Sequence, residues 1–330
     1  MMPESTAPQG CLSEANDPED GLDRSVLKEL EKMLPKGLLL YDEPMSAHTS
    51  FRIGGPADVF VQAKEADEVK AVLSFGREKA IPVTVIGNGS NLLVSDKGVE
   101  GIVLSIKDGN TQVGVPVYED GEKAVFQAFA GMSLSAFSKG AAKLGFIGTE
   151  PLAGIPGSIG GAVAMNAGAY GGEMKDVLKS VRVLDKELNE AVLSNGELEL
   201  GYRSSRILEE GLIVLSAEFE LKKGSAEEAL EKIAELNKKR KEKQPLELPS
   251  GGSTFKRPEG YFAGKLIEDA GLRGFRVGNA AVSEKHCGFV VNLGGASCAE
   301  VKELMEQVRE RVFKNSGVVL EPELRMIGRK

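Results

Sequence analysis

The sequence predicts a fold of mixed helices and strands in more than one domain, and three observations support this. At 330 residues the chain is long enough to build two or more hydrophobic cores. Segments with apolar residues at helical spacing alternate with short runs of β-branched residues. A central stretch, residues 145–172, has nine glycines among 28 residues but also carries large apolar side chains. This mixture favours an ordered, concave backbone over a flexible linker or a buried helix.

Composition excludes several classes of protein. Hydrophobic residues make up 42% and charged residues 27% of the chain, which is typical of soluble globular proteins. The formal net charge of −8 argues against a general nucleic-acid binder. No apolar run reaches the roughly 18 residues of a membrane span, and no signal peptide begins the chain, so we expect a cytoplasmic protein without membrane contact.

Cysteine and histidine usage predicts no metal site. The three cysteines, Cys11, Cys287 and Cys298, and the two histidines, His48 and His286, show no metal-ligand spacing. His286 and Cys287 are adjacent, which suggests a thiol nucleophile with a base. Because adjacent residues on a strand point to opposite faces, an incidental pair is the better interpretation.

Apolar periodicity and capping signals predict the elements in order. Residues 1–21, rich in Pro, Ser, Glu and Asp, are expected to be disordered. Helices are expected at 23–33, 67–79 and 133–144, from Ser225 to 241, and from Ser297 to Gly317, the last two beginning with capping boxes. Strands are expected at 59–63, 81–86, 101–106, 125–130, 213–221 and 318–327, with a hairpin of 181–184 and 190–193.

The loop at 87–91, GNGSN, follows directly on a predicted strand. Consecutive backbone N–H groups in such a turn can hold phosphate oxygens. The loop is not a dinucleotide-binding G-x-G-x-x-G motif, because Leu92 stands at the third glycine position, and it is not a Walker loop. Taken alone, the loop fits a hairpin turn better than a phosphate site.

Seven stretches taken together closely resemble the UDP-N-acetylenolpyruvoylglucosamine reductases, also called UDP-N-acetylmuramate dehydrogenases, which are flavoenzymes of peptidoglycan precursor synthesis. These stretches keep the order of the family and cover nearly all of the chain after residue 45. They are TSFRIGGPAD (49–58), GNGSNLLVSDKGVEGIVL (87–104), EPLAGIPGSIGGAVAMNAGAYGGE (150–173), GYRSSR (201–206), PSGGSTFKRP (249–258), FAGKLIEDAGLRGFRVGNAAVSEKH (262–286) and LEPELRMIG (320–328).

The resemblance implies an α+β fold: a vanillyl-alcohol-oxidase-type (PCMH-type) FAD-binding domain of two α+β subdomains, then a C-terminal α+β substrate-binding domain. We expect the FAD-binding domain at 22–224, with subdomain 1 at about 22–105 joined by the strand 318–330, and subdomain 2 at about 106–224. The substrate domain is expected at 225–317. The chain has no tyrosine-bearing insertion before Ser225, as in the shorter-loop branch of the family, and it departs from the family pattern at Arg257 and Gly288.

The resemblance also implies the site residues. Those expected to bind FAD are Arg52, Gly87, Asn88, Gly89, Ser90, Asn91, Leu92, Pro151, Gly154, Ile155, Pro156, Gly157, Ser158, Gly160, Gly161, Ala162, Asn166 and Gly168. Those expected to bind the UDP-linked substrate are Tyr170, Lys243, Lys256 and Arg325.

The implied reaction reduces an enol ether conjugated to a carboxylate, in UDP-N-acetylglucosamine enolpyruvate, with NADPH as the reductant of FAD. Hydride adds to the β-carbon, so charge develops on the carboxylate and a proton must reach the α-carbon. By match of motifs, Arg203 clamps the carboxylate, Glu323 helps to hold the enolate, and Ser253 donates the proton. We expect a monomer that binds no nucleic acid.

Two other classes of function remain as alternatives. An oxidase of the same superfamily would use O2, and His48 is the histidine that could attach its flavin covalently. A binding protein could keep the fold without catalysis. Without the resemblance, Ser253 fits a turn residue, Arg203 a surface charge and Glu323 the end of a strand.

Overall fold

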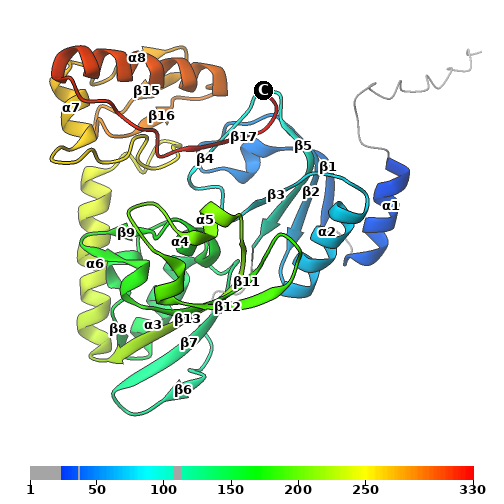
Figure 1. The fold of residues 1–330 in the computed structure, drawn as a ribbon. Helices are drawn as coiled ribbons and strands as arrows, with labels where there is room; N and C mark the ends of the chain where they lie inside the picture. Colours follow the sequence, from blue (N-terminus) through cyan, green and yellow to red (C-terminus); the bar gives the residue numbers. More distant parts are fainter. Residues whose placement is uncertain (1–23, 36–37, 108–112) are drawn as a thin grey trace, which may run out of the picture.

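The computed structural model describes residues 24–35, 38–107 and 113–330. The expected disordered extension, 1–21, lies outside the described residues. Three sheets of three or more strands organise the described chain, each with its own helices, and two pairs of short strands complete it (Figure 1). Within the described residues, every helix is too short or too polar to cross a lipid bilayer.

The first sheet has the strand order β1-β2-β5-β3. Its inner strands are parallel, and β1 pairs antiparallel with β2 at one edge. The helix between β2 and β3 begins after Glu65, whose side chain forms a capping box with Glu68. The strands are β1 (Leu39–Pro44), β2 (Pro56–Ala63), β3 (Val83–Ile86) and β5 (Val99–Ile106), and the helices are α1 (Arg24–Met33), α2 (Ala66–Glu78) and the 3-10 turn η1 (Met45–His48).

The second sheet is antiparallel, with the order β12-β11-β13-β7-β6 and β8 beside β13. Its strands are β6 (Tyr118–Glu119), β7 (Lys123–Phe129), β8 (Phe146–Ile147), β11 (Leu178–Leu184), β12 (Glu190–Ser194) and β13 (Ile213–Lys223). Its helices are α3 (Leu134–Lys143), α4 (Ile159–Ala164) and α5 (Arg206–Glu210), with 3-10 turns η2 (Glu150–Leu152), η3 (Met174–Asp176) and η4 (Asn195–Leu198). The glycine-rich stretch supplies α4 and the small hairpin of β9 (Gly168–Ala169) and β10 (Gly172–Glu173).

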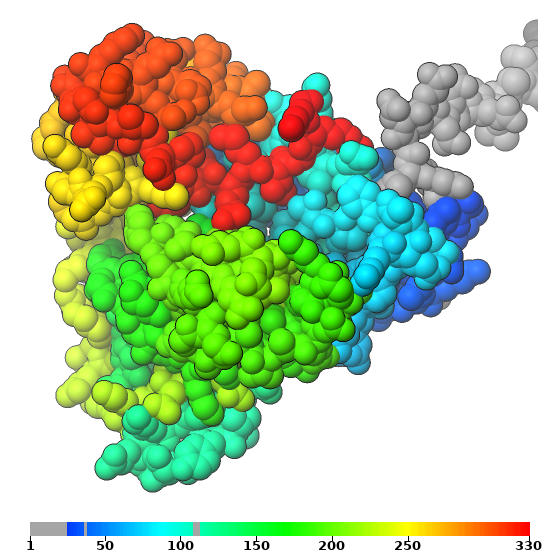
Figure 2. All heavy atoms as spheres, in the orientation of Figure 1, coloured from blue at the N-terminus to red at the C-terminus, as the bar shows by residue number. Residues whose placement is uncertain are grey.

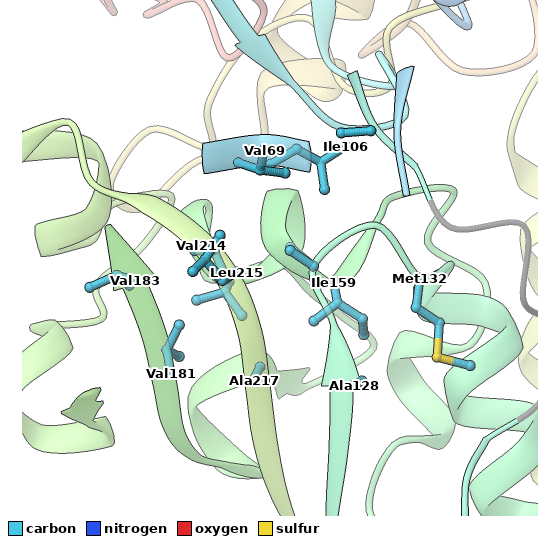
Figure 3. Close-up of a cluster of buried hydrophobic side chains, with 14 of the residues drawn as sticks. Val69, Ile106, Ala128, Met132, Ile159, Val181, Val183, Val214, Leu215 and Ala217 are labelled. Atoms are coloured by element: carbon cyan, nitrogen blue, oxygen red, sulfur yellow. The ribbon is translucent and has the colours of Figure 1, made fainter. Parts of the chain in front are cut away.

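The first two sheets share one hydrophobic core. Val69 of α2 and Ile106 of β5 belong to the same buried cluster as Leu215 of β13 and Ile159 of α4 (Figure 3). A common core of this kind fixes the relative position of the two sheets, since separating them would expose apolar surface on both.

Helix α6 (Ala226–Lys243) joins the second sheet to the third unit (Figure 1). Ser225 caps it by accepting from the Glu228 N–H at 3.2 Å, which is one of the two hydrogen bonds of the predicted capping box. Ala229 and Ile233 of α6 pack against Ala142 and Ala153. These contacts hold α6 against the second sheet, directly after the predicted domain boundary at 224/225.

The third unit has a small antiparallel sheet, β14-β15-β16, and two helices. Its elements are α7 (Ala263–Asp269), β14 (Arg276–Val277), β15 (Ala280–Val282), β16 (Val290–Asn292) and α8 (Cys298–Ser316). Helix α8 begins at the capping box of Ser297 and Glu300 and ends at Gly317 with φ +71°, as expected from its sequence.

The chain then returns to the first part of the fold. Strand β17 (Arg325–Ile327) pairs in parallel with β4 (Leu92–Val94), the strand after the 87–91 loop. Figure 2 shows this returning segment, in red, lying between the third unit and the N-terminal part of the chain. Only 325–327 of the strand expected at 318–327 is regular, because Pro322 lacks the N–H that a sheet ladder requires.

Candidate active site

Two cavities meet between the three units. The larger, of about 1570 Å³, is lined by the loop 87–91, the segment 153–170, the C-terminal part of α6 and residues near β17. The smaller, of about 330 Å³, is lined mainly by the third unit, including Phe255, Arg257 and Lys285. Four residues line both cavities: Arg203, Ser253, His286 and Glu323. The three residues predicted to be catalytic thus lie together where the cavities join.

The two glycine loops touch each other at the base of the larger cavity. A Cβ atom on Gly87 would collide with the Ser158 hydroxyl of the other loop. Gly89 has φ +62°, and a Cβ there would collide with the carbonyl oxygen of His48. Gly89 therefore requires glycine, because the collision there is with backbone, whereas a side chain at Gly87 would have to displace the Ser158 hydroxyl.

Most of the residues expected to bind the cofactor line the larger cavity. These are Arg52, Gly87, Asn88, Gly89, Ser90, Asn91, Leu92, Gly154, Ile155, Pro156, Gly157, Ser158, Gly161, Ala162 and Gly168. Pro151, Gly160 and Asn166 line neither cavity. The Asn166 amide is turned inward: it donates to Glu173 Oε2 (3.0 Å) and Gly201 O (2.9 Å) and accepts from the Lys175 N–H (3.0 Å). Asn166 therefore supports the loop rather than facing a ligand.

The larger cavity is positively charged although the protein is acidic overall. Seven of its lining residues are Lys or Arg and two are Glu, in a chain of net charge −8. Tyr170, Lys243 and Arg325, expected to bind substrate, line this cavity. Lys256 lines neither cavity, and its Nζ lies 3.3 Å from Glu321 Oε2 instead. An excess of cations beside exposed backbone favours phosphate-bearing ligands.

Arg203 and Glu323 form a close ion pair at the junction. Arg203 Nε donates to Glu323 Oε1 at 2.7 Å, and the two side chains are only 19% and 11% exposed. Arg203 has φ +57°, a strained backbone conformation for a residue with a side chain. The Glu323 backbone is held from both sides, because its N–H donates to Thr254 O (2.9 Å) and its carbonyl accepts from Asn91 Nδ2 (3.1 Å). Loops distant in sequence thus fix this pair.

Ser253 is held in place while its hydroxyl stays available. It follows Gly252, which has φ +82°, and precedes Thr254, whose N–H donates to Gly288 O at 2.9 Å. Thr254 Oγ1 also accepts from the Val290 N–H at 2.8 Å. Among the described residues, none forms a hydrogen bond with the Ser253 hydroxyl, which is exposed to the cavities. The hydroxyl is therefore able to meet a ligand.

Comparison with known proteins decides the family. Residues 244–327 match the family model described as the C-terminal domain of UDP-N-acetylenolpyruvoylglucosamine reductase, and residues 57–187 match an FAD binding domain. The UDP-N-acetylenolpyruvoylglucosamine reductase of Lachnoclostridium phytofermentans is 54% identical over 92% of this chain and 98% of its own length. The chain belongs to the UDP-N-acetylenolpyruvoylglucosamine reductase family.

Two further relatives of the reductase family agree. The reductase of Clostridioides difficile is 46% identical over 92% of this chain and 98% of its own length. The crystal structure of the reductase from Thermus caldophilus superposes with a TM-score of 0.72 at 36% identity, covering 88% of this chain and 98% of that one. The predicted fold class, an FAD-binding domain followed by a C-terminal domain, is confirmed.

The cofactor of this reductase-family chain is FAD, and the larger cavity fits it. Gly89 leaves no room for a side chain, and the glycines of the 87–91 loop border the cavity with their backbone, next to Arg52. Such a surface suits a pyrophosphate. His48, by contrast, lines neither cavity: its ring stacks on Phe60 at 3.8 Å and its Nε2 lies 2.8 Å from Glu43 Oε1. That position does not suit covalent attachment of flavin.

The structure also shows site residues that the sequence reasoning missed. Arg240, on α6, lines the larger cavity and donates to Gly154 O of the glycine-rich stretch. In the sequence, Arg240 stands in a run of basic residues at the end of a helix, where such residues commonly complement the helix dipole. On α6 it lies about one turn before Lys243, so both side chains are on the same face of the helix. Arg257 lies over the Phe262 ring at 4.0 Å, at the rim of the smaller cavity.

Cys287 is buried, and burial raises the pKa of its thiol. A buried thiol that holds its proton is a poor nucleophile. The burial of Cys287 therefore supports the interpretation that His286 and Cys287 are adjacent by chance and do not form a nucleophile with its base.

Proposed function

We propose that the protein reduces UDP-N-acetylglucosamine enolpyruvate to UDP-N-acetylmuramate in peptidoglycan precursor synthesis, with FAD as cofactor and NADPH as reductant. The supporting observation is that Arg203, Ser253 and Glu323 meet where the FAD cavity joins the smaller cavity of the third unit. When bound, FAD supplies the hydride for the substrate and takes it up from NADPH.

Arg203 is proposed to bind the substrate carboxylate. Its Nε is committed to Glu323 and its Nη2 lies 3.4 Å from Gly168 O, while Nη1 has no partner among the described residues. Reduction of the double bond moves negative charge onto the carboxylate as an enolate. A guanidinium that is already fixed in place stabilises that charge without reorganisation.

Glu323 is proposed to act through Arg203. A carboxylate facing the enolate directly would repel it, whereas a carboxylate bonded to Nε fixes the plane of the guanidinium. Nη1, which has no partner among the described residues, is then free to meet the substrate.

Ser253 is proposed to donate the proton to the α-carbon. An enolate is a strong base, so a hydroxyl suffices as the acid when it is correctly placed, and general acid catalysis of this kind contributes about 10²–10⁴-fold. The turn that holds Ser253 is fixed through Thr254, which supplies the placement.

Other features of this assignment are also proposals. We place the enzyme in the cytoplasm as a monomer, and we keep the domain limits at 224/225 and 317/318. Gel filtration and cell fractionation test the first two, and limited proteolysis tests the third.

An anaerobic spectrum tests the function. The purified protein should absorb as oxidised flavin, lose its colour on addition of NADPH, and regain it on addition of UDP-N-acetylglucosamine enolpyruvate. Recovery of colour with O2 but not with the enolpyruvate would show an oxidase. Absence of bleaching with NADPH would refute the proposal.

A further inference from the structure

His286 is the fourth residue that lines both cavities, beside Arg203, Ser253 and Glu323. We infer that His286 belongs to the reaction site, where its Nε2–H donates a hydrogen bond to the substrate carboxylate as charge develops on it. The inference rests on the proposed function and adds a catalytic residue to it.

The imidazole is held in one tautomer by the backbone. The N–H of Gly288 donates to His286 Nδ1 at 3.1 Å. Because a backbone N–H can only donate, Nδ1 carries no proton, and the neutral ring carries its proton on Nε2. Among the described residues, none accepts from Nε2, so this donor is left for a ligand.

Glycines on two segments make room for the ring. A Cβ on Gly288 would lie 3.0 Å from Cε1 and 3.1 Å from Nδ1 of His286, and a Cβ on Gly264 would lie 3.2 Å from Cε1. The ring thus fills the space that a side chain at 288 would need.

The turn that carries His286 is bonded to the turn that carries Ser253. Gly288 O accepts from the N–H of Thr254, the residue after Ser253, at 2.9 Å. The Phe289 ring, at 5.1 Å and nearly perpendicular, packs against the imidazole from the other side. The His286 side chain is therefore held at a fixed position relative to Ser253, the proposed proton donor.

The charges around His286 favour a neutral ring. Burial is the largest cause that lowers its pKa below the ordinary value, and the charges of Arg273 on the third unit and Lys243 on α6 lower it further. A hydrogen bond with its own backbone and the charge of Glu268 on α7 act in the opposite direction without reversing the shift. Arg203 and Glu323 border the same junction. A neutral N–H adds a donor for the enolate without adding another charge to be buried, and its hydrogen bond strengthens as the oxygen gains charge.

The test compares two variants with a control on the same turn. His286→Phe keeps a packed ring but removes the donor, His286→Gln restores an N–H of similar reach, and Glu284→Gln alters an exposed neighbour that lines neither cavity. Each is followed by rapid-mixing absorbance in both half-reactions, with thermal melting to confirm folding.

We expect His286→Phe to bleach with NADPH at the wild-type rate but to reoxidise with substrate about 10²–10³-fold more slowly, as for loss of a donor to a developing oxyanion. His286→Gln should recover most of that loss, and Glu284→Gln should match the wild type. Full speed in His286→Phe, equal slowing of both half-reactions, or weaker substrate binding at an unchanged rate would each overturn the inference. If His286→Phe does not fold, a rate for His286→Gln more than about tenfold below wild type would also overturn it. Failure of the wild type to reoxidise with substrate would instead refute the proposed function.

Discussion

The most direct test of the cofactor site is the substitution Gly89→Ala. This glycine has φ +62°, and a single added methyl group would collide with the carbonyl oxygen of His48. The collision is with backbone, so rotation of a side chain does not relieve it. The 87–91 loop must change shape or push away segment 48–50.

Two contributions set the size of the effect. A left-handed conformation costs an L-residue about 1–2 kcal/mol. Movement of the loop also breaks the hydrogen bond from the Ser50 N–H to Gly89 O, 3.2 Å in length, and such a bond contributes about 0.5–1.5 kcal/mol. In the free variant the 87–91 loop would relax to a different shape, and FAD binding would have to restore the original one. The binding free energy would then be weaker by about 2–3 kcal/mol, which corresponds to a roughly 30- to 150-fold rise in the Kd for FAD.

The assay is a fluorescence titration of the flavin-free protein with FAD. Gly196→Ala is the matched control, because the surroundings of Gly196 are open and it lies outside the cavities. A Kd for Gly89→Ala within threefold of wild type would refute the close backbone approach. An equal loss in Gly196→Ala would show that the loss is not specific to the loop.

Four further outcomes are expected. Ser253→Ala and Glu323→Gln should bleach normally with NADPH but reoxidise with substrate about 10²–10⁴-fold more slowly, and rapid mixing would contradict this if both steps slowed alike. Arg240→Met should weaken FAD binding about 10- to 150-fold, because a charged donor to Gly154 O is lost; an unchanged Kd would contradict that role. Alkylation of native Cys287 by iodoacetamide should be slow at pH 7 and fast after unfolding, because burial raises the pKa of its thiol, and mass spectrometry distinguishes the two. Burial lowers the pKa of His286 in the folded state, so just below pH 6.5 the unfolded chain binds more protons than the folded chain. The melting temperature should therefore fall as the pH drops through that range, and it should fall less in His286→Gln.

The helix ends show what local sequence signals can predict. Ser225 and Ser297 begin α6 and α8, and Gly317 ends α8, because capping depends on residues a few positions apart. The match of Arg203, Ser253 and Glu323 to family motifs identified them, but no local signal shows that segments 120 residues apart meet.

Two residues that the resemblance implied at the ligands, Asn166 and Lys256, line neither cavity. Their side chains found partners within the protein instead. His286 was missed for the converse reason: Arg203 and Glu323, with which it lines both cavities, approach it only in the folded chain.

The pairing of β17 with β4 has a consequence for biosynthesis. Asn91 holds the backbone of a residue 232 positions later, so the ribosome must make nearly the whole chain before the edge of β4 is covered. Until then Leu93, fully buried in the finished protein, lacks most of its packing partners, which lie between Phe255 and Leu324, and it stands beside an unpaired strand edge. Such an edge is a template for association with other chains. Chains that stall before β17 should therefore be the ones that depend on chaperones, whatever the stability of the completed fold.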